Sequence, residues 1–270
     1  MKERVAAIQM ASGPNIGANL IEAARLIAQA AADGARLVVL PENFACMPLQ
    51  THDLVKVCEP DGSGAMQDFL RESAVRHGLW IVGGTVPLHA RQPDRIRAAC
   101  LLIGPDGQVH ARYDKIHLFD VHLVEGNEHY NESETIESGD QPVVADTPFG
   151  RLGLAICYDL RFPELFRSLI DKGAEVIALP AAFTAITGRA HWESLLRARA
   201  IENLAWIIAA AQGGYHVNGR ETHGDSMIID PWGQICDRLP RGSGVVAATI
   251  DSERTASVRR TFPALLHRRL

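Results

Sequence analysis

The sequence offers little from which a disulfide framework or a metal centre could be built. It has five cysteines, an odd number, and no two of them form a C-x-x-C pair. These features argue against a disulfide-stapled scaffold and against a zinc ribbon. The eleven histidines form neither an H-x-x-x-H nor an H-E-x-x-H pattern, and neither a Walker loop nor a G-x-G-x-x-G motif is present. We therefore expect no catalytic metal and no bound nucleotide.

Long apolar runs and an excess of basic residues are missing as well. No apolar run approaches the length of a membrane span, and the first eight residues lead into a strand-like pattern without the apolar core of a secretory signal. The net charge is −5, and the most basic segment, at 259–269, is short. A nucleic-acid-binding domain would be strongly basic. We expect a cytoplasmic protein with no membrane or nucleic-acid partner.

Strand-like and helix-like segments alternate along the 270 residues, and two hairpin signals, at 104–107 and 231–233, interrupt the alternation. A chain of this length, 47% hydrophobic, can bury a sizeable core. The pattern predicts an α/β fold with mixed sheets in one domain that spans residues 1–270. The predicted strands are 5–10, 36–40, 79–86, 97–103, 108–113, 152–156, 176–179, 205–211, 226–230, 234–238 and 245–250, and the predicted helices are 19–32, 65–77, 163–172 and 192–203.

Residues 33–44 resemble residues 172–183. Both segments run through a helix end, a glycine, a strand, Leu-Pro, a turn and a phenylalanine, and each follows a strand and a helix. Two interpretations stay open, because any two βαβ units look alike, whereas a true repeat would indicate a pseudo-symmetric pair of sheets. The residue after the proline is Glu42 in the first segment and Ala181 in the second. Under the second interpretation, the acid is a local addition to a shared scaffold.

An apolar run at 152–156 ends abruptly at Cys157, and a charged segment that contains a proline follows it. A thiol at the end of a buried strand can leave the core and enter a pocket, where it can act as a nucleophile. The plain alternative is that Cys157, like most free cysteines, behaves as a small buried hydrophobic residue. Its position, and the polar Tyr158, Asp159 and Arg161 that follow it, favour the nucleophile.

Two charged residues stand where partners of such a thiol are expected. Glu42 follows a predicted strand and Pro41, where desolvation would raise its pKa towards the value that suits a general base; otherwise it is a solvated carboxylate. Lys115 lies in the segment Tyr-Asp-Lys-Ile-His-Leu-Phe-Asp at 113–120. A lysine near a developing oxyanion would stabilise it, although most lysines are simply exposed.

The acidic segment 128–137 holds further carboxylates, and its composition suggests that all of them are solvated. From the residues alone, none of the four is preferred as a site residue. They are Glu128, Glu132, Glu134 and Glu137.

Three motifs together resemble the nitrilase superfamily of carbon–nitrogen hydrolases. They are Leu-Pro-Glu-Asn at 40–43, the segment at 113–120, and Ile-Cys-Tyr-Asp-Leu-Arg-Phe-Pro-Glu at 156–164, in that order. The resemblance covers nearly the whole chain, from 5 to 263, and the segments 182–188, 190–193 and 219–224 are similar to the Nit branch. It implies a four-layer α-β-β-α sandwich with two mixed β-sheets, and association into a homodimer or a higher homo-oligomer.

The resemblance also implies a chemistry. Glu42, Lys115 and Cys157 match the triad of the family, and Glu132 best matches its second glutamate. Glu128 is the lesser candidate for that role, and the question arises because the loop 121–130 departs from the usual pattern. The implied enzyme is a cysteine-dependent amidase that hydrolyses a small amide to an acid and ammonia through a thioester. It needs no cofactor.

Nit-branch similarity implies a carboxylate-bearing amide as the small-molecule substrate. Deaminated glutathione, in a metabolite-repair reaction, fits most closely. The alternatives are ω-amidase action on α-ketoglutaramate, another nitrilase-family amidase or carbamoylase activity, and a non-catalytic interaction protein on the same fold. The complete triad disfavours the last of these, because a relic would be free to lose Glu42 or Lys115.

The resemblance suggests contacts for the oxyanion and the substrate. The backbone N–H of Tyr158, together with Lys115, would stabilise the oxyanion. Arg161 is the candidate cation for a substrate carboxylate, unless it is a salt-bridge partner of Asp159 or Glu164. The other candidate lining residues, which could equally serve core packing and helix capping, are Phe183, Thr187 and His191.

Overall fold

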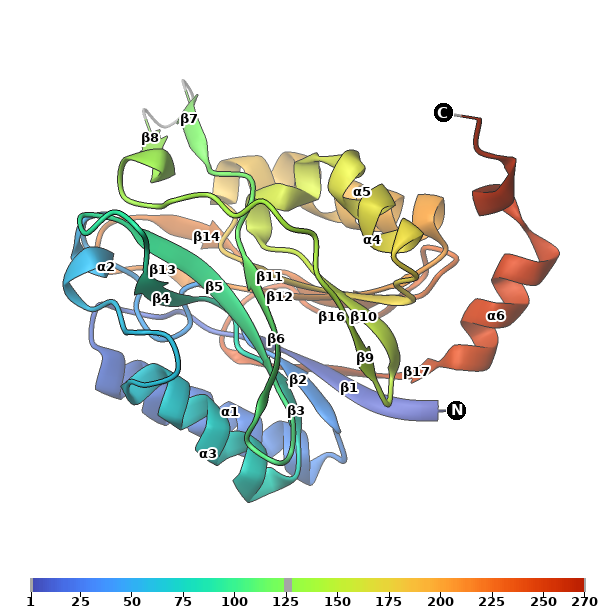
Figure 1. Ribbon diagram of the computed structural model, residues 1–270, viewed down its shortest axis with the longest axis horizontal. Coiled ribbons are helices and arrows are strands. Elements are labelled where there is room, and N and C mark those ends of the chain that lie inside the picture. The colour runs from blue at the N-terminus through green and yellow to red at the C-terminus, as the bar shows by residue number, and fades with distance from the viewer. Residues whose placement is uncertain (1, 124–127, 270) are drawn as a thin grey trace.

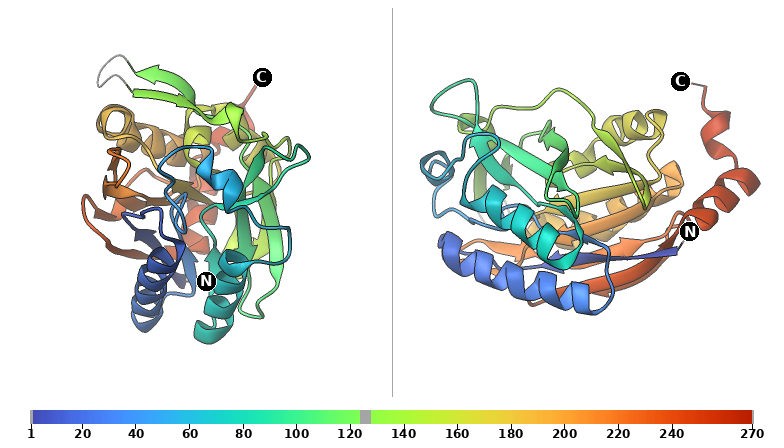
Figure 2. Two further views of the ribbon diagram at one scale, coloured as in Figure 1. Left: turned by 90° about the vertical axis from the view of Figure 1, so that its left-hand side faces the viewer. Right: turned by 60° about the horizontal axis from the view of Figure 1, so that its bottom comes forward.

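Two mixed β-sheets lie face to face at the centre of the molecule, and helices cover the outer face of each (Figures 1 and 2). The computed structural model describes residues 2–123 and 128–269, so part of the predicted loop 121–130 lies outside it. The four-layer α-β-β-α sandwich expected from the sequence is confirmed. Its central strands are buried on both faces and read as continuous apolar runs, as is typical of parallel strands between layers.

The first sheet has the strand order β17-β1-β2-β3-β5-β4, with β6 paired to β5. Strands β1, β2 and β3 run parallel, and the other pairings are antiparallel. Helices α1 and α3 cover its outer face (Figure 1). The bounds are β1 (Lys2–Gln9), α1 (Ile16–Ala32), β2 (Leu37–Val39), α3 (Ala65–His77), β3 (Trp80–Val82), β4 (Val86–His89), β5 (Ile96–Ile103), β6 (Val109–Asp114) and β17 (Gly244–Asp251).

The second sheet has the order β16-β15-β12-β11-β10-β9, with β10, β11 and β12 parallel. Helices α4 and α5 cover its outer face (Figure 1). The bounds are β9 (Val144–Thr147), β10 (Gly150–Leu154), α4 (Pro163–Asp171), β11 (Val176–Ala181), α5 (Ala185–Asn203), β12 (Trp206–Ala211), β15 (Ser226–Ile229) and β16 (Ile235–Leu239).

Short elements surround the sandwich. Two hairpins, β7 with β8 and β13 with β14, rise from its edge, and α6 with the segment after it extends beyond one end (Figures 1 and 2). Among the described residues, no helix is long and apolar enough to cross a bilayer. The bounds are α2 (Asp53–Lys56), β7 (Asp120–Leu123), β8 (Glu128–Asn131), η1 (Glu132–Glu134), η2 (Cys157–Arg161), β13 (Gly213–Tyr215), β14 (Glu221–His223), α6 (Ser252–Thr261) and η3 (Ala264–His267).

Most predicted elements differ from the structure by at most three residues at either end, and two differ by more. The predicted strand 79–86 is two strands, because the chain turns at Gly84 with φ +58°, where a Cβ atom would lie 2.2 Å from the carbonyl oxygen of Pro41. The predicted helix 192–203 begins earlier, at Ala185. Thr184 caps it by accepting a hydrogen bond from the N–H of Thr187 at 3.2 Å. Both differences arise where the backbone serves the neighbouring site.

The two similar segments occupy matching places in the two sheets. In each sheet a strand, a helix and a parallel neighbouring strand follow one another, as β1-α1-β2 and as β10-α4-β11. Strands β2 and β11 contact each other across the sandwich. Glu42, in the loop after β2, and Ala181, the last residue of β11, therefore lie at the ends of neighbouring strands in opposite sheets.

Candidate active site

Cys157 lies on a tight turn just after β10. Its backbone adopts φ +47°, a left-handed conformation that is uncommon for a residue with a side chain and that clusters at functional sites. The turn is held from both sides, because Asp159 N–H donates to Ile156 O at 3.0 Å and Ile156 N–H donates to Asp159 Oδ2 at 2.8 Å. The Cys157 side chain therefore lies at the border of the core and lines a cavity at the strand end.

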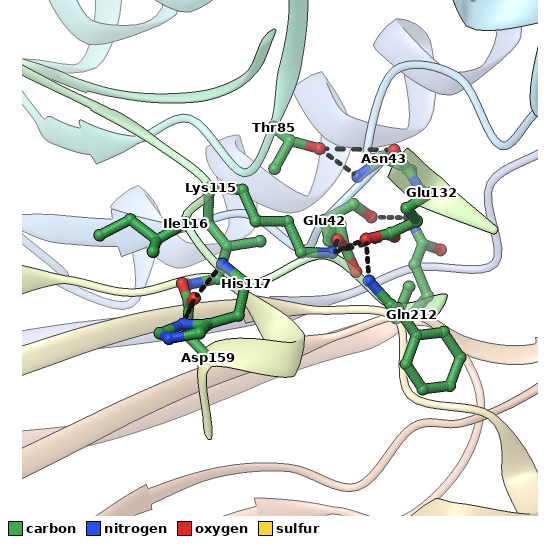
Figure 3. A network of polar contacts seen from close by, with 12 residues as sticks. Glu42, Asn43, Thr85, Lys115, Ile116, His117, Glu132, Asp159 and Gln212 are labelled. Carbon is green, nitrogen blue, oxygen red and sulfur yellow. Dashed lines mark hydrogen bonds and ion pairs between the residues drawn. The ribbon is translucent and has the colours of Figure 1, made fainter. Parts of the chain in front are cut away.

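Lys115 is fully buried, and its ammonium group forms ion pairs with two carboxylates (Figure 3). Its Nζ donates to Glu42 Oε1 at 2.8 Å and to Glu132 Oε2 at 2.8 Å. Glu132 also accepts from the N–H of Phe119 at 2.8 Å. Glu128 is engaged elsewhere, since its Oε2 accepts from the hydroxyl of Tyr130 at 2.9 Å. The structure thus brings Glu132, and not Glu128, to Lys115, and the expectation that Glu132 is solvated was wrong.

The Glu42 carboxyl does not have the raised pKa that its burial suggested. Burial acts to raise it, but the charge of Lys115 and hydrogen bonds from Lys115 and Cys157 outweigh that effect and hold the pKa below its ordinary value. Burial likewise acts to lower the pKa of Lys115, while the charges of Glu132 and Glu42 raise it well above its ordinary value. Glu42 is therefore a carboxylate and Lys115 an ammonium at neutral pH.

The Cys157 thiol keeps its proton in this setting. Burial and the negative charge of Glu42 raise the pKa of the thiol well above its ordinary value, against the opposing influence of Lys115 and of a hydrogen bond with the Ala182 backbone. A thiolate would place a third negative charge beside one ammonium. The thiol must therefore lose its proton during reaction, and the carboxylate of Glu42 is the neighbouring acceptor.

Asp159 connects the segment that carries Lys115 to the segment that carries Cys157. It is fully buried and accepts from the hydroxyl of Tyr113 at 2.7 Å and from the backbone N–H of His117 at 3.1 Å. The His117 ring Nδ1 lies 2.7 Å from the same carboxylate (Figure 3). Tyr113 and His117 lie two residues to either side of Lys115. Sequence reasoning missed this role, although the even spacing of polar residues in the segment was a usable signal.

The Glu42 backbone is fixed by its own set of contacts. Gln212 Nε2 donates to Glu42 O at 3.0 Å (Figure 3). The next residue, Asn43, adopts φ +55° and donates its N–H to Thr85 Oγ1 at 2.8 Å. Gln212 is itself bound to Ser12, which donates its N–H to Gln212 Oε1 at 3.0 Å. The carboxylate is therefore held in place before any substrate arrives.

Most predicted substrate contacts line the cavity at Cys157. Tyr158, Arg161, Phe183 and Thr187 lie in its wall, and His191 lies behind it, 3.1 Å from Arg161 Nη1 through its Nδ1. The guanidinium of Arg161 also lies over the rings of Tyr158 and Phe183, at 5.8 and 5.2 Å. None of the described carboxylates forms an ion pair with it, so the salt-bridge alternative for Arg161 was wrong. Thr187 also serves the first turn of α5 through Thr184.

A larger cleft adjoins this cavity. The cavity measures about 20 Å³, close to what one water molecule needs, whereas the cleft measures about 380 Å³. The cleft has room for a small molecule, and the cavity joins it to Cys157. Sequence reasoning missed the cleft residues Tyr130 and Arg220, which come from two hairpins far apart in the chain. The residues that line both spaces are Glu42, Asn43, Phe119, Glu132 and Arg220.

In the part of the chain that the structure describes, no group of three or more His, Cys, Asp or Glu side chains is placed to hold a metal ion. The site consists of a thiol, an ammonium and two carboxylates beside a cleft. These are the groups that a hydrolase needs if it works through a covalent thioester. Fold and site together thus define the class as a cysteine-dependent hydrolase.

The comparisons with known proteins agree with that class. The chain belongs to the carbon–nitrogen hydrolase family, whose model, described as carbon-nitrogen hydrolase, matches residues 4–260. It is therefore a hydrolase that acts on carbon–nitrogen bonds, as the sequence motifs predicted.

Three similar proteins illustrate the match. A relative from Yersinia enterocolitica, named deaminated glutathione amidase, is 44% identical over 269 residues, which are 98% of this chain and 92% of the relative. The structure of Saccharomyces cerevisiae Nit3, described as a member of branch 10 of the nitrilase superfamily, matches with a TM-score of 0.89 at 32% identity. The match covers 100% of this chain and 97% of that chain. The C. elegans NitFhit structure has a TM-score of 0.88 at 36% identity, with 99% of this chain and 65% of that chain covered.

Proposed function

We propose that this protein hydrolyses a carboxylate-bearing amide through a thioester on Cys157, and that its substrate is deaminated glutathione. The observation that carries the catalytic part is the buried ammonium of Lys115, shared by Glu42 and Glu132 beside the Cys157 thiol. The similarity to relatives that bear the name deaminated glutathione amidase supports the substrate.

The first half of the reaction forms the thioester. Glu42 accepts the proton of Cys157 while the sulfur attacks the amide carbonyl carbon, and the carbonyl oxygen becomes an oxyanion. The ammonium of Lys115, with the backbone N–H of Tyr158, stabilises that charge. The intermediate collapses when the carbon–nitrogen bond breaks and the protonated Glu42 returns its proton to the leaving nitrogen.

The second half releases the acid. Glu42, again a carboxylate, accepts a proton from water as the water attacks the thioester carbonyl. The carbon–sulfur bond then breaks, and Cys157 regains its proton from Glu42. Glu132 holds the ammonium of Lys115 in place and helps to position the water.

The leaving group depends on the substrate. A tripeptide is built with secondary amides, so its cleavage releases an amine rather than ammonia. Ammonia leaves only from a primary amide such as α-ketoglutaramate. With deaminated glutathione the acid is therefore α-ketoglutarate, and the nitrogen product is cysteinylglycine instead of the ammonia that the resemblance implied.

Assembly into a homo-oligomer and a cytoplasmic location are part of the proposal. Support for assembly comes from the exposed apolar side chains Trp232, Phe262 and Leu266, which lie around α6 and the segment after it. Support for a reducing compartment comes from the five cysteines, all of which are free thiols.

The test is product release from deaminated glutathione and, in parallel, from α-ketoglutaramate. The wild type is compared with Cys157→Ala and with the control Cys236→Ala, which removes an exposed thiol. We expect turnover of the tripeptide, at least tenfold preferred by kcat/KM, to be lost in Cys157→Ala only. A preference for α-ketoglutaramate would overturn the substrate and keep the mechanism. Full activity of Cys157→Ala would overturn the mechanism, and inactivity of the wild type on every amide tried would favour a non-catalytic interaction protein.

A further inference from the structure

Arg220 stands at the junction of the cavity and the cleft, and it has no counter-ion there. It lines both spaces. Among the described residues, no carboxylate forms an ion pair with it, and no acceptor meets its buried Nε. Buried polar atoms in folded proteins nearly always have a partner, so an unpartnered donor on a residue that lines a binding site calls for an explanation.

The guanidinium is held in place by groups that do not neutralise it. Nη2 donates to the carbonyl oxygen of Ala182, and the ring of Tyr130 lies 5.0 Å from the guanidinium carbon. Both contacts orient the planar group and leave its charge available. Its positive charge also reaches Glu42, where it adds to the effects of burial, Lys115 and Cys157 on the pKa of that carboxyl.

The turn that carries Arg220 is also fixed. Arg220 O accepts from the N–H of His216 at 2.9 Å, and Arg220 N–H donates to Asn218 Oδ1 at 3.0 Å. Asn218 in turn donates to the carbonyl of Pro48 across the cleft at 2.8 Å, and His216 Nδ1 lies 2.8 Å from Ser12 O. The arginine is therefore preorganised before substrate binds, which lowers the entropic cost of using it.

One residue links the guanidinium to the nucleophile. The backbone of Ala182 hydrogen bonds with Cys157, and the carbonyl of the same residue accepts from Arg220. A single residue spans only about 3.5 Å of chain. Arg220 and Cys157 also line the same small cavity. A group bound to Arg220 therefore lies near a carbonyl carbon bound at Cys157, which fits the short acyl half of a substrate better than a distant end of the leaving half.

We infer that Arg220 determines the specificity of the site for the acyl half of the substrate, because it binds a carboxylate that this half carries. This inference rests on the proposed function and names the specificity of the same site. A guanidinium can pair with a carboxylate through two parallel hydrogen bonds. It would also shield that carboxylate from the negative charges of Glu42 and Glu132, and hold the acyl half while the leaving half departs.

Arg161 is the alternative cation, and its contacts make it the weaker candidate. Its guanidinium is already engaged by His191 and covered by two aromatic rings. It lines the small cavity but not the cleft. Arg161→Gln is therefore a comparison arm of the test.

The first experiment measures selectivity with Arg220→Gln, Arg220→Lys and the control Arg189→Gln, which removes an exposed arginine outside the cavity and the cleft. Deaminated glutathione and α-ketoglutaramate share the same acyl half, so their kcat/KM values should fall together in Arg220→Gln by about 10- to 100-fold, mainly through KM. Turnover of pentanamide, a neutral amide, should fall at least tenfold less than turnover of the two carboxylates, because pentanamide has no carboxylate to pair with the guanidinium. Arg220→Lys should recover part of the loss.

A second experiment does not depend on turnover. Glutarate should protect Cys157 from alkylation by iodoacetamide in the wild type and in Arg189→Gln, and at least tenfold more glutarate should be needed in Arg220→Gln. If the proposed amidase activity fails while this shift stands, the inference survives the proposed function.

Three results would overturn the inference. The first is unchanged selectivity and unchanged glutarate protection in an active Arg220→Gln enzyme. The second is a loss confined to the tripeptide, which would place the bound carboxylate on the leaving half. The third is a larger loss of carboxylate selectivity in Arg161→Gln than in Arg220→Gln.

Discussion

At the scale of single residues, the site separates the acidities of two neighbouring groups. The pKa of the Glu42 carboxyl lies below its ordinary value, and the pKa of the Cys157 thiol lies well above its own. The thiol is thus inert until a nearby carboxylate takes its proton. The reactivity of Cys157 should depend on Glu42 more than on its exposure, which is only 8%.

We therefore predict that Cys157 reacts with iodoacetamide faster than the exposed Cys236, and that Glu42→Gln removes this advantage. The amide of glutamine keeps the shape but cannot accept the thiol proton, so kcat should also fall by about 10²- to 10⁴-fold. Mass spectrometry of peptides after timed labelling measures the first effect. Glu134→Gln, at an exposed position of the same acidic segment, is the matched control. Equal labelling rates of Cys157 and Cys236 in the wild type would count against the nucleophile.

The pH profile follows from the same shifts. Glu42 must be a carboxylate and Lys115 an ammonium, and the pKa of the first lies below 4.5 while that of the second lies well above 10.5. A lowered pKa keeps Glu42 ionised as pH falls, and a raised pKa keeps Lys115 charged as pH rises. We predict a kcat/KM plateau across neutral pH with its acidic limb below 4.5. An acidic limb near neutrality would contradict the assignment of Glu42 as the base.

The site residues that directly follow a strand were predictable from the sequence. The site residues that reach the site only because two distant loops lie close together were not. Cys157 and Glu42 each follow an apolar run, and the end of such a run marks the end of a buried strand, where a side chain can reach a pocket. Glu132 lies on η1 directly after β8, and Arg220 lies on the turn between β13 and β14. Their sequence neighbours do not show which strand end they approach. Their positions depend on packing between segments about 90 residues apart, so only a family resemblance could single out Glu132 beforehand, and nothing singled out Arg220.

At the scale of elements, the two sheets are joined at the site by polar side chains. Asp159 on η2 binds Tyr113 on β6 and His117 just after it. His117 also stacks on Phe162, with ring centroids 3.7 Å apart and an angle of 5° between the ring planes, which adds to the contact between these two segments. Correct placement of Lys115 relative to Cys157 therefore depends on this one buried carboxylate.

We predict that Asp159→Asn lowers the free energy of unfolding by about 2 kcal/mol, since one acceptor oxygen becomes a donor that faces existing donors in a buried site. Activity should fall as well, because the Lys115 segment loses its anchor to η2. Urea denaturation measures the first effect and kcat the second. Asp146→Asn, where the side chain is 89% exposed, should leave both unchanged, and an equal loss in that control would show that the effect is not specific to the buried site.

Element types were predicted better than element bounds. The alternation of apolar strands and amphipathic helices predicted the sandwich. Burial on both faces makes a strand continuously apolar, and burial on one face gives a helix its amphipathic pattern. The break at Gly84 was missed because it depends on the close approach of the Pro41 carbonyl, which is a tertiary contact. The early start of α5 was missed because Gly188 weakens the helical signal in its first turns, while the cap by Thr184 and contacts with β14 stabilise it there.

At the scale of the whole molecule, α6 and the segment after it extend beyond the sandwich and expose apolar side chains (Figure 2). Trp232 and Phe262 meet edge to face at 5.6 Å while each remains about half exposed. Neighbouring exposed apolar side chains at one end of a folded protein favour contact with a second molecule.

We predict that the protein elutes from a sizing column with light-scattering detection as a homo-oligomer of the 29.4 kDa chain. Leu266→Asp, at a position 80% exposed, should shift it towards the monomer because a charge cannot be buried at an apolar contact without a partner. Tyr215→Asp, which is 78% exposed on β13, is the matched control. A wild-type protein that is monomeric at all concentrations would refute the prediction.

The pairing of a one-water cavity with a much larger cleft has a kinetic consequence. The leaving half departs through the cleft, and the water that completes the reaction enters by the same route. Any small primary amine that enters at that moment competes with water for the acyl group on Cys157 and forms a new amide. The ratio of aminolysis to hydrolysis at rising hydroxylamine concentration therefore reports how well the cleft admits an amine in competition with water.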